Sequence, residues 1–177
     1  IGRDGEYHRI LDFLGGVRSG EGGHLLIIGE PGQGKSYLWT GVVEQQRLEG
    51  EQWCFYKSPQ TGRVPYRGLA TVLRQLIDAA DAGGHPGVRA MGQRAQEIVS
   101  FLIPELQRGR SPSRGGETQA LPGEAEYELM RTMVALCEQT APVVIALDDI
   151  QWIDEQSLSV FEALAGSLPD QTALVFI

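Results

Sequence analysis

Residues 29–36 combine side-chain types and spacing that suit phosphate chemistry. They fit the phosphate-binding pattern G-x-x-x-x-G-K-[ST] at every fixed position. Glycine allows backbone angles and close approaches that a Cβ would block, so the amide N–H groups of such a loop can point at a phosphate. We therefore predict a phosphate-binding loop, called the P-loop below, that consists of Gly29, Glu30, Pro31, Gly32, Gln33, Gly34, Lys35 and Ser36.

Two side chains at the end of the P-loop have distinct expected roles. Lys35 is expected to reach the β- and γ-phosphates of a nucleotide, and the Ser36 hydroxyl to take a place on Mg²⁺. Tyr37 lies in the first turn of the helix that follows, where the amides and the helix dipole favour an anion. The alternative, an ordinary glycine-rich turn with a chance lysine, accounts poorly for a match at all fixed positions.

A second stretch places acids where a nucleotide site needs them. Residues 142–147 form a continuous apolar run that ends in Asp148 and Asp149. A buried parallel strand would put these acids at the sheet edge where α/β folds bind ligands. We assign Asp148 to Mg²⁺ binding and Asp149, with Lys35, to catalysis, Asp149 by activating the attacking water. For Asp149 the alternative is a helix N-cap or turn residue.

The residues after the acidic pair leave two alternatives open. Asp154 opens a helix and is interpreted first as its N-cap, with a role near the phosphates as the weaker alternative. Trp152 could pack in the core or act as a hinge toward a neighbouring domain, and we expect core packing.

The elements that must position these residues follow from hydrophobic periodicity. The P-loop lies between an apolar run at 24–28, typical of a buried strand, and a helix at 37–48. Alternating strands and helices predict an α/β fold, a three-layer α/β/α sandwich with a parallel sheet. The remaining expected elements are strands at 53–56 and 172–177 and helices at 4–17 (with Asp4 as N-cap), 66–80, 88–102, 124–139 and 154–165.

Composition narrows the class of protein. The 177 residues are 42% hydrophobic and 21% charged, as in a soluble globular domain. A net charge of −8 argues against direct nucleic-acid binding by this segment. No apolar run is long enough to span a membrane, and Cys54 and Cys137 are expected to be free thiols in the cytoplasm. Residues 107–123 are rich in Gly, Ser, Arg and Pro and predict a mobile loop. We expect the sequence, which ends within an apparent strand, to be a segment of a larger protein.

Several strings beyond the P-loop resemble one known family. Residues 1–6 are similar to its G-R-x-x-E motif, residues 64–69 to its "P-Y-x-P-L/F" segment, and residues 101–106 to "L-L-P-E-L". The most specific string, residues 147–158, resembles "L-D-D-L-Q/H-W-A-D-x-x-S-L". Together these motifs resemble AAA-like P-loop ATPase domains of the STAND class, which occur in LuxR-type and MalT-like regulators and in ATPase-linked adenylate or guanylate cyclases.

The resemblance implies a set of cofactors and site residues. It implies binding of ATP or ADP with Mg²⁺ by Lys35, Ser36 and the pair Asp148 and Asp149. It also implies that Gly2 and Arg3 lie near the adenine, mainly through backbone contacts. The expected sheet order, 5-1-4-3-2, would place the final strand of this chain beside the P-loop strand.

The same resemblance also implies what this chain leaves out. The polar sensor, the fifth strand and a lid or winged helix are expected after the final strand, so 1–177 is interpreted as the ATPase core. Neighbouring effector domains are the implied partners, and nucleotide-dependent self-association stays open. No arginine finger can be assigned, since Arg63, Arg67 and Arg74 are expected on the surface.

Three functions compete at this point. The first is a regulatory switch that binds ATP and hydrolyses it slowly. The second is a nucleotide-dependent scaffold with little or no hydrolysis. The third, a P-loop kinase for a small acceptor, lacks a motif for an acceptor pocket and disagrees with the string that follows Asp148.

Overall fold

The computed structural model describes residues 3–46, 51–106 and 123–177 of the chain. The strands in these ranges are β1 (Gly23–Leu26), β2 (Gln52–Lys57), β3 (Val143–Asp148) and β4 (Thr172–Phe176). The α-helices are α1 (Asp4–Arg18), α2 (Lys35–Gln46), α3 (Arg67–Ala82), α4 (Gln93–Leu102), α5 (Gly123–Thr140) and α6 (Glu155–Ala165). Short 3₁₀ turns are η1 (Gly87–Ala90), η2 (Pro104–Leu106) and η3 (Ile150–Trp152).

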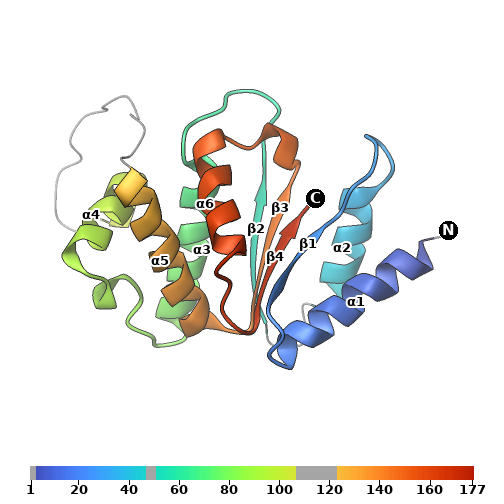
Figure 1. Cartoon of the computed structure of the whole chain (residues 1–177), viewed down its shortest axis with the longest axis horizontal. Helices are drawn as coiled ribbons and strands as arrows, with labels where there is room; N and C mark the ends of the chain where they lie inside the picture. The colour runs from blue at the N-terminus through green and yellow to red at the C-terminus, as the bar shows by residue number, and fades with distance from the viewer. Residues whose placement is uncertain (1–2, 47–50, 107–122) are drawn as a thin grey trace.

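The strands form one parallel sheet in the order β1-β4-β3-β2. The last strand in the sequence, β4, therefore lies beside β1, the strand before the P-loop, as the resemblance implied. Helices cover both faces of this sheet, and Figure 1 shows α1 and α2 on one side and α3 to α6 on the other. The predicted three-layer α/β/α sandwich with a parallel sheet is confirmed.

Two apolar clusters hold the layers together. The smaller cluster joins α1 and α2 to the sheet, with Ile10, Leu14 and Val42 among its buried members. The larger one packs α3, α5 and α6 on the opposite face. Strand β3 contributes to both because each of its six residues is buried. A strand covered on both faces needs a continuous apolar run, and this explains the absence of polar alternation before Asp148.

Two details of the predicted helices are wrong. Asp4 is not the N-cap of α1, because the helix already includes it and Arg3 occupies the cap position without a side-chain cap bond. The helix expected over 88–102 begins only at Gln93, because Gly92 is extended, with φ of −60° and ψ of 157°, and separates η1 from α4. Apolar spacing alone does not reveal such a break.

Some sequence predictions concern the remaining parts of the chain. Of the loop expected at 107–123, residues 107–122 lie outside the described residues. Cys54 and Cys137 are free and buried, as expected, and burial raises the pKa of Cys54 to about 12. None of the helices in the described ranges combines the length and apolar character that crossing a bilayer requires.

Candidate nucleotide site

The P-loop connects the end of β1 to the start of α2 at the carboxyl edge of the sheet. Gly32 and Gly34 have φ of +82° and +75°, a region that L side chains rarely adopt. A Cβ on Gly29 would lie 2.7 Å from the side-chain oxygen of Gln33, an exposed side chain that can move away, so the backbone angles of Gly32 and Gly34 are the stronger requirement for glycine. The loop backbone therefore adopts the left-handed angles for which glycines are needed at these positions.

The two P-loop side chains with expected roles lie at the beginning of α2. Lys35 Nζ donates a hydrogen bond to the Gly29 carbonyl at 2.8 Å, so the side chain folds back over the loop. Ser36 Oγ donates to Asp148 Oδ1 at 3.0 Å. This second bond joins residues that are 112 positions apart and brings the P-loop helix to the acid at the end of β3.

Asp148 is the last residue of β3 and is 4% exposed. Its Oδ1 accepts from Ser36 Oγ and, at 2.9 Å, from the Asp149 amide. Asp149 follows in the left-handed region, with φ of 59° and ψ of 44°, which Asp tolerates better than most residues. The tight turn aims both carboxylates at the same edge of the sheet, and Gln151 donates to Asp149 Oδ1 at 3.1 Å.

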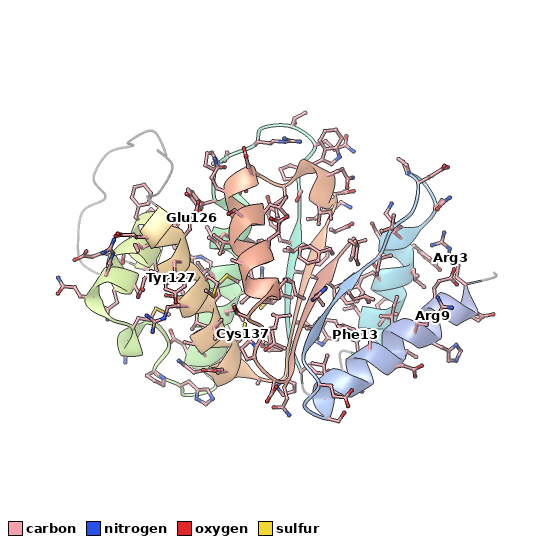
Figure 2. The ribbon with its side chains drawn as sticks, in the orientation of Figure 1. Arg3, Arg9, Phe13, Glu126, Tyr127 and Cys137 are labelled. Atoms are coloured by element: carbon pink, nitrogen blue, oxygen red, sulfur yellow. The ribbon has the colours of Figure 1, made fainter. Side chains whose placement is uncertain are left out.

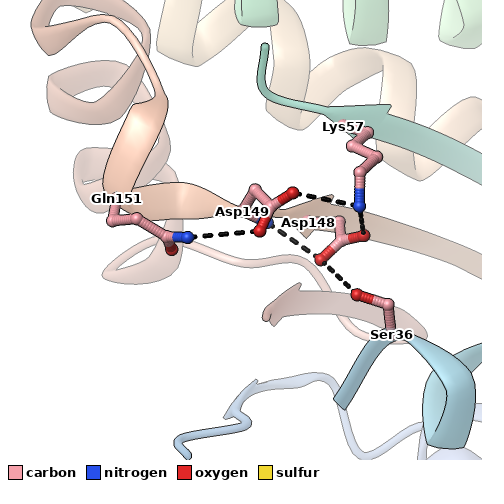
Figure 3. A network of polar contacts seen from close by, with 5 residues as sticks. All are labelled: Ser36, Lys57, Asp148, Asp149 and Gln151. Carbon is pink, nitrogen blue, oxygen red and sulfur yellow. Dashed lines mark hydrogen bonds and ion pairs between the residues drawn. The ribbon is translucent and has the colours of Figure 1, made fainter. Parts of the chain in front are cut away.

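Lys57 is a site residue that sequence reasoning missed. Figure 3 shows its ammonium between the two acids, with Nζ 2.7 Å from Asp148 Oδ2 and 3.0 Å from Asp149 Oδ2. Hydrogen bonds to Asp148 first, and then to Asp149, raise the pKa of Lys57. The signal in the sequence was a lone cation at the carboxyl end of a strand, but its partners depend on the pairing of β2 with β3.

A cavity of about 600 Å³ lies next to the P-loop and Asp149, and its lining does not include Ser36, Asp148 or Lys57. Its lining includes Gly29, Gly32 and Lys35 from the P-loop and Asp149 from the acidic pair. The loop after β2 contributes Gln60 to the same cavity. A volume of this size is typical of sites for small molecules and cofactors.

The residues present fit a nucleotide with Mg²⁺. Ser36 Oγ and the Asp148 carboxylate offer the hard oxygen atoms that Mg²⁺ prefers, and they lie within hydrogen-bond distance of one another. The glycines leave the loop backbone accessible, and a Cβ built on Gly32 meets no atom within 4 Å. The N-terminus of α2 supplies unpaired amides and a positive dipole end.

The structure does not bring every predicted site residue to the cavity. Tyr37 lies in the first turn of α2, but its side chain is 85% exposed. Arg3 lies at the start of α1, as labelled in Figure 2, and no residue of α1 belongs to the described lining of the cavity. Gly2 lies outside the described residues. A role for Gly2 and Arg3 near the adenine stays a prediction.

Asp154 connects two helices and does not line the cavity. Its Oδ1 accepts from the Ser157 amide at 2.8 Å and so caps α6, which confirms the predicted N-cap. The same oxygen accepts from the Tyr66 amide at 2.7 Å, and Oδ2 accepts from the Gly68 amide at 3.4 Å. One buried carboxylate therefore caps the N-termini of both α6 and α3.

The expectation that Trp152 packs in the core is wrong. Its side chain is 36% exposed and lines the cavity, and Arg63 lies 5.9 Å above its ring. Arg63 also donates to the Gln151 carbonyl at 3.1 Å. The η3 turn after Asp149 directs Trp152 toward the rim of the site because the apolar position that enters the core is Ile153.

Comparisons with known proteins agree with this geometry. A family described as AAA ATPase domain matches residues 1–177. A protein of Rhizobium meliloti (strain 1021), itself uncharacterised, is 27% identical over 168 residues. The match covers 89% of this chain and 16% of the relative, so the chain spans a small part of that relative's length.

Proposed function

The chain belongs to the AAA ATPase domain family, and we propose that it binds ATP with Mg²⁺ at the P-loop and hydrolyses it slowly as a regulatory switch. The resemblance to STAND-class domains supports a place in a signalling or transcription-regulatory protein, with neighbouring effector domains as partners. Membership of the family indicates nucleotide binding in general. The regulatory switch and its place in a signalling or transcription-regulatory protein are our proposal.

One contact carries this proposal, the hydrogen bond from Ser36 Oγ to Asp148 Oδ1 at 3.0 Å. It joins the helix that would hold the phosphates to the strand that would hold the cation. Neither residue makes a nucleotide site without the other, and the fold brings them together from distant parts of the sequence. A chance glycine-rich turn would have no reason to meet a buried carboxylate.

Each residue would then have a defined role. The loop amides and Lys35 would bind the phosphates, and Ser36 and Asp148 would hold Mg²⁺, which offsets phosphate charge when bound. Asp149 would accept the proton of the attacking water while the bond to the terminal phosphate breaks. Asp149 Oδ1 accepts from Gln151 and Oδ2 lies 3.0 Å from Lys57 Nζ, and each oxygen keeps a lone pair with which it would accept from the water.

Replacing Asp149 with asparagine tests the catalytic role. Asparagine also tolerates the left-handed backbone at this position, so the change removes the charge and keeps the turn. We expect phosphate release at saturating Mg·ATP to fall about 100-fold, as for loss of a general base, with ATP affinity within about threefold of the wild-type chain. Asp170→Asn, an exposed change, is the matched control. Unchanged turnover in Asp149→Asn would contradict the role.

A switch also requires different structures with ATP and ADP. We expect backbone amides of residues 149–153 to exchange hydrogen more slowly with a non-hydrolysable ATP analogue than with ADP, because the analogue adds the terminal phosphate next to Asp149. Hydrogen exchange read by mass spectrometry measures this difference in the same chain. Identical exchange in the two states would rule out a switch within this domain.

A nucleotide-dependent scaffold is the second candidate. The observation that favours it is the engagement of Asp149 by Lys57 and Gln151, which leaves neither carboxylate oxygen without a partner. The guanidinium of Arg63, a surface arginine near the site, contacts the Gln151 carbonyl and the Trp152 ring. In a scaffold, these contacts would hold Arg63 at the rim of the site, where it would not assist hydrolysis. Tight binding of ATP together with no measurable phosphate release by the wild-type chain would favour the scaffold over the switch.

A further inference from the structure

The chain has two lysines in 177 residues, Lys35 and Lys57, and both lie at the candidate site. Lys35 belongs to the P-loop pattern, but no motif accounts for Lys57. Lys57 is the last residue of β2 and pairs in register with Asp148, the last residue of β3. Parallel pairing therefore places a cation directly beside the acid that would hold Mg²⁺.

The contacts of Lys57 tie both acids to one ammonium group. Its Nζ lies 2.7 Å from Asp148 Oδ2 and 3.0 Å from Asp149 Oδ2. The Asp148 side chain is 5% exposed, whereas the Lys57 side chain is 54% exposed. The Asp148 carboxylate is therefore buried, whereas the lysine stem can move into solvent without disturbing the core.

The two carboxylate oxygens of Asp148 have different partners. Oδ1 faces Ser36 and the P-loop, and Oδ2 faces Lys57 (Figure 3). A divalent cation held by Ser36 and Asp148 would add positive charge to a carboxylate that already carries the Lys57 ammonium. Like charges on one partly buried carboxylate repel one another, so the cation and Lys57 oppose each other.

We propose that Lys57 is a positioning residue that holds Asp148 and Asp149 together when no divalent cation is present and is displaced from Asp148 when the cation binds. The inference rests on the proposed function only for the identity of the site. Its consequence is that the cation binds poorly by itself and arrives with the nucleotide, whose phosphates compensate the positive charge of Lys57. Lys57 thereby makes cation binding depend on nucleotide binding.

Titration of the nucleotide-free chain with Mn²⁺ tests the competition directly. Free Mn²⁺ is read by electron paramagnetic resonance for the wild-type chain, Lys57→Met and Lys57→Arg. We expect Lys57→Met to bind Mn²⁺ about tenfold more tightly, since one opposing charge is lost, and Lys57→Arg to behave like the wild type. Arg74→Met is the matched control, because it removes a charge from the surface ion pair with Glu105. Equal or weaker Mn²⁺ binding by Lys57→Met, or none, would overturn the proposal.

Amine acylation read by mass spectrometry gives a second readout without any substitution. We expect Mg·ADP to lower the reactivity of the Lys35 amine and to raise that of the Lys57 amine. The phosphates would cover Lys35, and the cation would displace Lys57 from Asp148. Protection of Lys35 with unchanged or lowered reactivity of Lys57 would contradict the displacement. An unprotected Lys35 would instead contradict the proposed nucleotide site, and the Mn²⁺ titration would still decide the role of Lys57.

Discussion

Replacing Asp154 with alanine is expected to lower the free energy of unfolding by about 3 kcal/mol, since it removes a helix cap and leaves buried amides without an acceptor. Asp154 is 5% exposed and accepts three backbone hydrogen bonds, from the amides of Ser157, Tyr66 and Gly68. The first belongs to the beginning of α6, and the other two precede or open α3. One side chain therefore stabilises two helix N-termini and the contact between them.

Urea denaturation followed by circular dichroism measures this loss. Asp154→Asn keeps one acceptor oxygen and is expected to lose about 1–2 kcal/mol, because a neutral amide caps a helix more weakly than a charged group in a buried site. Glu162→Ala, on the exposed side of α6, is the matched control and is expected to change stability by less than about 0.5 kcal/mol. A loss below about 1 kcal/mol for Asp154→Ala would show that the two helices do not depend on this carboxylate.

Local signals were enough to predict the P-loop and its setting. The glycine spacing is contiguous in the sequence, and the structure has the P-loop between β1 and α2. The same holds for the cap bond from Ser157 to Asp154, which spans three residues. The expectation of a buried strand at 24–28 is wrong: β1 ends at Leu26, which is 51% exposed, and Ile28 is 82% exposed, because β1 is the edge strand of the described sheet. The family match confirms the AAA ATPase part of the resemblance drawn from the motifs, and the STAND class stays a prediction.

Contacts that depend on strand pairing or helix packing could not be predicted in this way. Lys57 meets Asp148 across 91 positions, and Tyr66 meets Asp154 across 88, so neither contact leaves a local pattern. Trp152 was assigned to the core on its size, whereas the geometry of η3 directs Ile153 inward instead. The roles of Gly2 and Arg3, the mobile loop over 107–122 and a cytoplasmic location stay predictions, whereas Gly123, the last residue of the expected loop, begins α5.

Lys35→Ala is expected to have the largest effect on nucleotide binding. Lys35 Nζ already lies over the loop, 2.8 Å from the Gly29 carbonyl, so its ammonium needs little movement to meet a phosphate in the cavity. Truncating a charged partner of a phosphate costs about 2–5 kcal/mol, which corresponds to a loss of affinity between about 30-fold and about 4,000-fold. The substitution leaves the glycines, the α2 amides and the Ser36–Asp148 hydrogen bond in place. The loss of ATP affinity therefore measures the contribution of the Lys35 ammonium.

The measurement that tests the central claim most directly is calorimetric titration of the wild-type chain and of Lys35→Ala with ATP in the presence of Mg²⁺. Arg9→Ala, which removes a positive charge from the exposed side of α1 (Figure 2), is the matched control. A P-loop nucleotide site predicts one ATP per wild-type chain, unchanged binding by Arg9→Ala, and an affinity about 100-fold lower for Lys35→Ala. Equal binding by the wild type and Lys35→Ala, or no binding by a folded wild-type chain, would contradict it.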